Sequence, residues 1–287
     1  MKNYSGIYPV KKMAKTLNIS RSRYYSWLTT QSSAYKRRDV ELGEIIEEIF
    51  HDNRGAYGSP RVHRNMTEQR GIHCARKRVA RLMREKGLKA RQKRRFKITT
   101  DSRHDYPISP NLLGRDFSVA KPNIVWVSDI TSIDTQEGWL YLCIVLDLFS
   151  RIIAGWAMES HMKAELAITA LSMAVIHRKP PEKLLFHSDQ GIQYASGPFR
   201  EKLDEFKMLQ SMSRKGDCWD NACAESFFAT LKNEEVFHRR YKTRDEARRS
   251  IFEYIAVFYN RQRSHSYLDF LSPVEYELRM SRVHNVA

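Results

Sequence analysis

The sequence is poor in cysteine, and its few cysteines show no arrangement that would organise a fold. There is no CxxC pair in the 287 residues, and the four cysteines are Cys74, Cys143, Cys218 and Cys223. The nearest approach to a zinc site is the set His51, His63, His73 and Cys74, which lacks a second close cysteine. We therefore expect reduced thiols, with no disulfide framework and no structural zinc.

Long apolar runs are also missing. The first residues, MKNYSGIYPVKK, place charges where a secretory signal needs an apolar segment, and the most apolar run, 139–149, is short and contains Asp147. With 42% hydrophobic and 11% aromatic residues, the chain is neither globally disordered nor fibrous. We expect a soluble intracellular protein of two or three domains.

Acidic residues are scarce only in the first third of the chain. Residues 1–100 hold 25 of the 49 Lys and Arg but only 8 of the 33 Asp and Glu, so this part carries the whole net charge of +16. The remainder is almost neutral. Such an excess indicates a polyanionic partner, either nucleic acid or an anionic membrane surface.

The basic front predicts two helical units. Apolar residues at three- and four-residue steps predict a helix over 8–17, and Ser20 is placed to cap a second one after a short turn. This pair matches a helix-turn-helix, although an ordinary helical hairpin is the better explanation of the stretch taken alone. In the second unit we expect Asp39 to cap one helix and Ser59-Pro60 to start another.

A last helix of the front, 75–86, has an unusually basic surface. Glu85 is its only acid, and besides the terminal Lys86 it carries five cations: Arg76, Lys77, Arg78, Arg81 and Arg84. A solvated helix face normally mixes both signs, so contact with phosphates is the better interpretation. The segment 89–97, KARQKRRFK, continues this charge through Arg94 and Arg95 and leads into a linker ending near Pro122. We interpret it as an arm that follows a DNA backbone, the alternative being a solvated tether.

After Pro122 the pattern changes to that of an α/β domain. Strands are predicted over 123–131, 139–148, 152–158 and 183–188, with helices over 163–177 and 198–206. Three strands, a helix, a strand and a helix give a mixed sheet, in the order of a ribonuclease H-like fold.

Carboxylates stand where this fold would expose them. Asp129 ends the first strand, Asp189 ends the strand after the crossover helix, and Glu225 lies on a later helix with Lys232 seven residues on, on the same face. Three carboxylates without zinc-type ligands suit Mg²⁺ or Mn²⁺, with two ions per site serving phosphodiester cleavage and strand transfer.

Other polar residues near these positions have ordinary structural explanations. We interpret four aspartates as caps, turn residues or salt-bridge partners: Asp134, Asp147, Asp217 and Asp220. For Asp147, contact with the metal site is a minor alternative. His187 either touches the site or packs in the core.

The strings around these residues are long and specific. They include WVSDIT, WLYLCIVLDLFSRIIAGW, LLFHSDQGIQYAS, GDCWDNACAESFFATLKNE and YNRQRSHSYLDFLSP, and 35 residues separate Asp189 from Glu225. Over nearly its whole length, the chain resembles the integrase-core (DDE) transposases of a large group of bacterial insertion sequences, which are related to retroviral integrases.

The resemblance implies a transposase that binds the ends of its insertion sequence, nicks the 3′ ends and joins them to target DNA. It implies Mg²⁺ bound by Asp129, Asp189 and Glu225, with Lys232 contacting DNA. Joining two ends requires at least a dimer, and the family encodes a small upstream helix-turn-helix protein that acts separately or as a frameshift fusion. A cytoplasmic, nucleoid-associated location follows, with no membrane partner. The alternatives are a non-catalytic DNA-binding regulator, descended from a transposase, and a simple metal-dependent nuclease.

The tail is predicted to be helical. Thr243 and Glu246 form a capping box, and Ser272-Pro273 opens a last helix. Between them a basic segment borders the DNA channel or forms a solvated loop, its members being Asn260, Arg261, Arg263 and His265. The expected organisation is a helix-turn-helix unit (1–35), a second DNA-binding unit with its arm (36–97), a linker (98–120), the catalytic core (121–235) and a helical extension (236–287).

Overall fold

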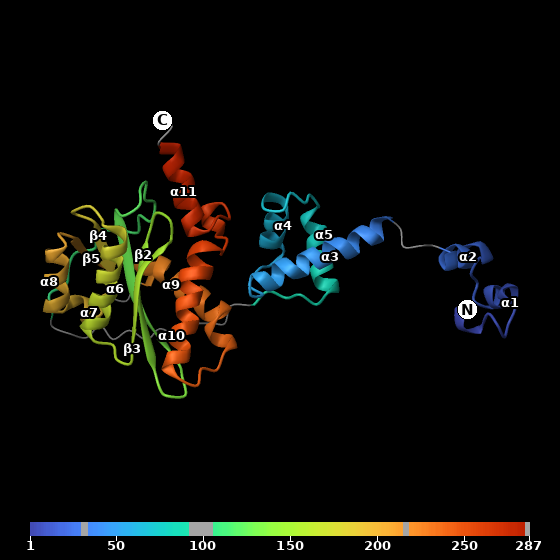
Figure 1. Cartoon of the computed structure of the whole chain (residues 1–287), viewed down its shortest axis with the longest axis horizontal. Helices are drawn as coiled ribbons and strands as arrows, with labels where there is room; N and C mark the ends of the chain where they lie inside the picture. Colours follow the sequence, from blue (N-terminus) through green and yellow to red (C-terminus); the bar gives the residue numbers. More distant parts are fainter. Residues whose placement is uncertain (30–33, 92–105, 215–217, 285–287) are drawn as a thin grey trace. The chain divides into compact units, whose positions relative to one another are not determined.

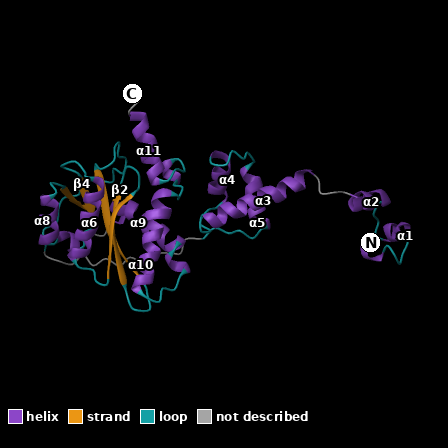
Figure 2. Ribbon diagram, in the orientation of Figure 1, coloured by secondary structure: helices purple, strands orange, loops and turns teal. Residues whose placement is uncertain are grey.

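The computed structural model describes residues 1–29, 34–91, 106–214 and 218–284, which form two compact units (Figures 1 and 2). Unit 1 comprises Met1–Asp52 and Gly58–Lys89, and unit 2 comprises Asn53–Tyr57 and Ala90–Ala287. No helix in the described ranges is long and apolar enough to cross a membrane.

Unit 1 is helical throughout. Its elements are the 3₁₀ helix η1 (Lys2–Tyr4) and the helices α1 (Val10–Thr16), α2 (Arg21–Thr29), α3 (Ala34–Asp52), α4 (Ser59–Glu68) and α5 (Arg76–Glu85). The hydroxyl of Ser20 accepts the N–H of Arg23 at 3.1 Å, which confirms the predicted cap of α2. Helices α3, α4 and α5 share a small core in which Ile46, Val62 and Val79 are fully buried.

One predicted helix start in unit 1 is wrong, and the other, at Ser59-Pro60, is confirmed. Helix α3 begins at Ala34, so Asp39 lies inside it, where its carboxylate accepts hydrogen bonds from Arg78 at 2.7 Å and Arg81 at 2.8 Å. Ser59 is the first residue of α4 and Gly58 takes the cap position. The pairing of Asp39 with two arginines of α5 therefore outweighs its local capping signal, whereas at α4 only the cap lies one residue earlier than expected.

Unit 2 contains a five-stranded mixed sheet with the order β3-β2-β1-β4-β5. The strands are β1 (Val125–Ile133), β2 (Leu140–Asp147), β3 (Ile153–Glu159), β4 (Leu185–Ser188) and β5 (Leu209–Met212). The pairs β1–β2 and β2–β3 are antiparallel, whereas β4 runs parallel to β1 and β5 runs parallel to β4. This topology confirms the ribonuclease H-like fold.

Helices cover both faces of the sheet (Figure 1). One face packs against α6 (Ala164–Arg178), α7 (Ile192–Ala195) and α8 (Gly197–Glu205), and the other against α9 (Ala222–Glu234) and α10 (Arg244–Glu253). Successive residues of β1 point to opposite faces of the sheet. Val125 and Val127 pack in the core with α9 and α10, whereas Trp126 packs in the core with α6, α7 and α8.

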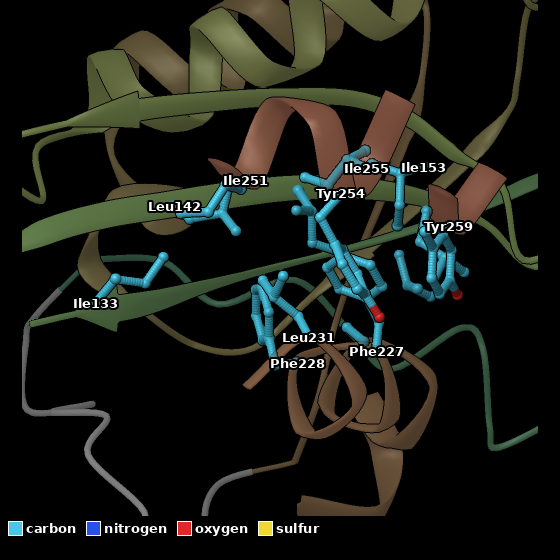
Figure 3. Close-up of a cluster of buried hydrophobic side chains, with 14 of the residues drawn as sticks. Ile133, Leu142, Ile153, Phe227, Phe228, Leu231, Ile251, Tyr254, Ile255 and Tyr259 are labelled. Atoms are coloured by element: carbon cyan, nitrogen blue, oxygen red, sulfur yellow. The ribbon is translucent and has the colours of Figure 1, made fainter. Parts of the chain in front are cut away.

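The C-terminal helices belong to the same core. In Figure 3, Phe227 and Leu231 of α9 meet Ile251 of α10 and Tyr254 of the following π-helix η4 (Tyr254–Tyr259) against the strands. The remaining elements are the 3₁₀ helices η2 (Cys218–Asn221), η3 (Val236–His238) and η5 (Ser266–Leu268), and the helix α11 (Pro273–His284). Residues 236–287 are therefore part of unit 2 and not a separate body.

Candidate active site

The sheet brings two of the predicted carboxylates to the same level on neighbouring strands. Val127 of β1 is in register with His187 of β4, so continuing this parallel register by two residues places Asp129 beside Asp189. Neighbouring strands lie about 4.8 Å apart. Both aspartates have the strand parity of Val125 and Val127, which is the face covered by α9.

Helix α9 brings Glu225 and Lys232 to this face. Its apolar side, with Phe227, Phe228 and Leu231, is buried against the sheet. The amide of Asn221, at the helix start, donates to the backbone carbonyl of Ser128 at 3.1 Å. This bond ties the beginning of α9 to the residue that precedes Asp129.

These side chains influence one another electrostatically. Burial and the nearby Asp189 raise the pKa of Asp129 well above its usual range, and Glu225 adds to this effect, while the ammonium of Lys232 opposes it. Partial burial and Asp189 also raise the pKa of Glu225. Burial lowers the pKa of Lys232, and the charge of Asp129 acts against that shift.

The donor set fits a hard divalent cation, because three mutually repelling carboxylates offer only oxygen and gain most from a shared positive charge. In the described residues, however, no three His, Cys, Asp or Glu side chains already converge as a metal-ligand cluster. Asp129 accepts the N–H of Ile130 at 2.8 Å and Asp189 that of Gly191 at 3.0 Å. A Cβ on Gly191 would lie 2.9 Å from the Asp189 carboxylate, so glycine leaves room for it.

An aspartate that sequence reasoning took for a structural residue organises the approach to α9. The carboxylate of Asp220 is buried and accepts hydrogen bonds from Arg214, Arg115 and Asn111. These bonds hold its pKa well below the usual range, the side chain of Arg214 contributing most. The salt-bridge interpretation is confirmed.

His187 packs inside the unit. It is fully buried, with its ring nitrogens 2.8 Å from the hydroxyl of Ser211 and 3.3 Å from that of Ser213. Burial lowers its pKa to about 4, so the ring is neutral near pH 7. It joins β4 to β5 and the residue after it through these hydroxyls.

Asp147 also has a structural place. Its carboxylate is buried and accepts the backbone N–H groups of Asn123 at 2.8 Å and Phe149 at 3.0 Å, with Arg178 at 3.4 Å. It pairs with Trp126, three residues before Asp129. It is therefore a turn and salt-bridge residue in this fold.

The structure divides the basic residues predicted to bind DNA. Arg76, Lys77 and Arg84 are exposed on α5, and Arg261 is exposed near the end of unit 2. Arg78 and Arg81 are occupied by Asp39, as described above. Arg94 and Arg95 lie outside the described residues.

Arg263 departs furthest from its predicted role. It is 4% exposed, and its guanidinium donates to Glu234 at 2.8 and 2.7 Å. The arginine is buried in an ion pair and presents no surface to phosphate in this structure. Neither member gave a signal in the sequence, because 28 residues separate them.

Comparisons with known proteins bear on the family and the domains of the chain. Residues 119–218 and 225–280 match two family models described as integrase core domains, and residues 36–96 match one described as an HTH-like domain. The fold, the carboxylates and these matches define an integrase-core protein with a helix-turn-helix-like domain in front of it.

The relatives are more specific. The chain is 44% identical, over 92% of its length and 97% of the relative, to the insertion element IS600 uncharacterized 31 kDa protein of Shigella sonnei. It is 38% identical to the transposase InsF for insertion sequence IS3A of Escherichia coli strain K12, over 94% of each chain. The chain belongs to the IS3 family of insertion-sequence transposases. Among solved structures, the catalytic core domain of BIV integrase aligns with 57% of this chain and 99% of its own, at 11% identity and a TM-score of 0.43.

Proposed function

We propose that this transposase cleaves the 3′ ends of its own insertion sequence and joins them to target DNA, with Asp129, Asp189 and Glu225 as its catalytic carboxylates. The observation that carries the proposal is the register of β1 and β4, which sets two aspartates side by side under the helix that bears Glu225. Carboxylates at neighbouring strand ends in an open sheet face the crevice where ligands bind.

The same three residues are the proposed ligands of Mg²⁺ or Mn²⁺, with two ions per site. Bound there, the ions would activate a water or a 3′-hydroxyl and stabilise the leaving oxygen. Lys232 would attract the phosphate beside them, since its charge already acts on Asp129. The helix α9 and its tie through Asn221 hold Glu225 and Lys232 on one side of the substrate.

DNA binding is assigned mainly to unit 1. Arg76, Lys77 and Arg84 are the exposed cations of α5 proposed to contact phosphates, while Arg78 and Arg81 brace α5 against α3. Because two element ends must be joined, we propose a homo-oligomer of at least two protomers. An upstream helix-turn-helix protein, separate or fused, remains a proposed partner.

The test uses the purified full-length protein and a labelled duplex that carries the inverted repeat flanking its own reading frame. In Mg²⁺ we expect cleavage and joining, and we expect Asp189→Asn to reduce both to background while end binding is unchanged. Asp204→Asn, at an exposed position on α8, is the matched control and should behave as wild type.

Four results would contradict the proposal. Full joining by Asp189→Asn would refute the carboxylate assignment, as would joining at normal rates in Ca²⁺ alone, because the larger ion tolerates looser geometry. Cleavage without joining would indicate a nuclease, and end binding without either reaction would indicate a regulator.

A further inference from the structure

A groove beside the carboxylates enters the function proposed so far only through Lys232. Its volume is about 700 Å³, and it is lined by the loop after β1 on one side and by the end of α9 with η3 on the other. Six of its lining residues carry the argument, and we call it the Trp139 groove: Asp134, Trp139, Lys232, Phe237, Arg239 and Arg240.

The groove adjoins the candidate active site. Lys232 lines it and also acts electrostatically on Asp129. Ser132, another lining residue, is three positions beyond Asp129 on β1, about 10 Å along the strand. Stacked nucleotides of one strand are about 3.4 Å apart, so a strand reacting at Asp129 reaches the groove within roughly three nucleotides.

The walls of the groove are joined by hydrogen bonds in which at least one partner is a backbone group. Thr135 forms a parallel β-bridge with Tyr241, and the N–H of Gln136 donates to the carbonyl of Tyr241 at 3.0 Å. Arg244 donates to the carbonyl of Trp139 at 3.0 Å, and its backbone N–H to the carboxylate of Glu137 at 2.8 Å. The groove is therefore a built feature, not a gap between loosely placed loops.

Two aromatic side chains are left accessible in this fixed frame. Trp139 is 51% exposed and Phe237 is 40% exposed, and both line the groove. Aromatic side chains stack on nucleic-acid bases, which contributes about 1–3 kcal/mol per base. Paired bases are already stacked inside their duplex, so only an unpaired base can use such a surface.

The charges select a nucleic acid over an apolar peptide. The lining of the groove contains three cations and one carboxylate: Lys232, Arg239 and Arg240 against Asp134. Arg239 also pairs with Glu235 at 2.6 Å, whereas Arg240 is exposed and has no ion pair among the described residues. A groove with excess positive charge and exposed aromatic rings combines the two features of single-stranded DNA sites.

We propose that the Trp139 groove holds unpaired bases of the DNA strand that adjoins the reacting phosphodiester, with Trp139 stacking on a base and Arg240 contacting its phosphate. The proposal rests on the proposed transposase function, and it adds that the ends of the duplex open by a few nucleotides when they enter the site. Opening would cost a few kcal/mol per unstacked step, which stacking on the protein offsets.

Binding without chemistry tests the proposal. Full-length protein in EDTA is titrated with a fluorescent duplex that carries a three-nucleotide 3′ overhang, and with the same duplex made blunt. We expect Trp139→Ala to weaken binding of the overhang duplex roughly five- to a hundredfold, and to change binding of the blunt duplex less than twofold. Trp139→Phe should keep most of the affinity. Phe252→Ala, at a 54% exposed aromatic position on α10 outside the groove, is the matched control and should match wild type.

A second readout locates the base. The base analogue 2-aminopurine, placed in turn at each overhang position, should be quenched by wild type and Trp139→Phe but not by Trp139→Ala. The proposal would be overturned if Trp139→Ala bound the overhang duplex within twofold of wild type, or if it lost equal affinity for both duplexes. The first of these results is also the one expected if the groove binds a protein. Because no reaction is measured, these outcomes are independent of whether Asp189→Asn abolishes joining.

Discussion

The carboxylate of Glu234 accepts hydrogen bonds from Arg263 at 2.8 and 2.7 Å and from the hydroxyl of Tyr254 at 2.7 Å. Glu234 is the last residue of α9, the helix that carries Glu225 and Lys232. Burying two charges costs desolvation energy, so the intact pair adds little net stability. Removing one partner leaves the other charge buried and unpaired, which typically costs about 3–5 kcal/mol.

At the residue scale, we therefore predict that Arg263→Ala destabilises unit 2 by about 3–5 kcal/mol. Arg261→Ala, two residues away and exposed, should change stability by less than about 0.5 kcal/mol. Urea unfolding followed by tryptophan fluorescence measures both. Replacing the pair together, with Glu234→Gln and Arg263→Met, should recover part of the loss because no lone charge remains buried.

If Arg263 contacted DNA phosphates instead, its replacement would have a different effect. Arg263→Ala would then unfold at the wild-type urea concentration and lose affinity for DNA, and the double replacement would recover nothing. That result would return Arg263 to the proposed DNA contacts.

At the scale of elements, the sheet and α6 approach each other at one glycine. A Cβ on Gly155 of β3 would lie 2.3 Å from the carbonyl oxygen of Ala170 and 2.6 Å from the backbone nitrogen of Ala174. Backbone atoms cannot move aside as a flexible side chain can. The closeness of β3 and α6, which fixes one layer of unit 2, therefore depends on this residue having no side chain.

Gly155→Ala should accordingly destabilise unit 2 by about 1–3 kcal/mol through overpacking. Gly197→Ala is the control, because its added Cβ meets nothing within 4 Å, and it should leave stability unchanged or slightly increased. Thermal unfolding followed by circular dichroism compares them. Equal melting temperatures for Gly155→Ala and wild type would mean that α6 can move away from the sheet at little cost.

The elements also show what can be read from the sequence. The strands β1 to β4, the helix α6 and the capping box at Thr243, whose hydroxyl accepts the N–H of Glu246 at 3.1 Å, follow from periodicity and local capping chemistry. The carboxylates were predictable because they follow strands that the pattern already defines. The strand β5 was missed because its four residues, LQSM, include two polar ones and form no apolar run like the one that marks β4.

Other features depend on partners far along the chain. The start of α3 was misplaced because Asp39 serves Arg78 and Arg81, about 40 positions away, instead of its own helix end. The π-helix η4 follows α10 without any change in the apolar pattern, so a helical period cannot distinguish it. Local chemistry thus predicts elements, whereas tertiary pairing decides which charges remain on the surface.

At the scale of the whole molecule, the net charge of +16 belongs entirely to the first 100 residues. The candidate active site instead concentrates carboxylates that repel one another and raise each other's pKa. Binding to DNA phosphates releases condensed cations, so the logarithm of the binding constant falls with the logarithm of salt concentration by about 0.9 per neutralised phosphate. The salt dependence of binding should therefore report on the first 100 residues, and the chemistry on the carboxylates of unit 2.

The last prediction separates these two contributions in the full-length protein. Replacing Arg76, Lys77 and Arg84 together by Gln should reduce the slope of the salt dependence by about two to three and weaken binding to all duplex sequences alike. Asp189→Asn, in the nearly neutral part of the chain after residue 100, should leave the slope unchanged. Fluorescence anisotropy with a blunt duplex of arbitrary sequence in EDTA, over a series of salt concentrations, measures both. An unchanged slope in the triple variant would move the phosphate contacts off α5, to cations such as Arg261 of unit 2. A slope altered by Asp189→Asn would mean that the carboxylates already oppose phosphate before any cation is bound.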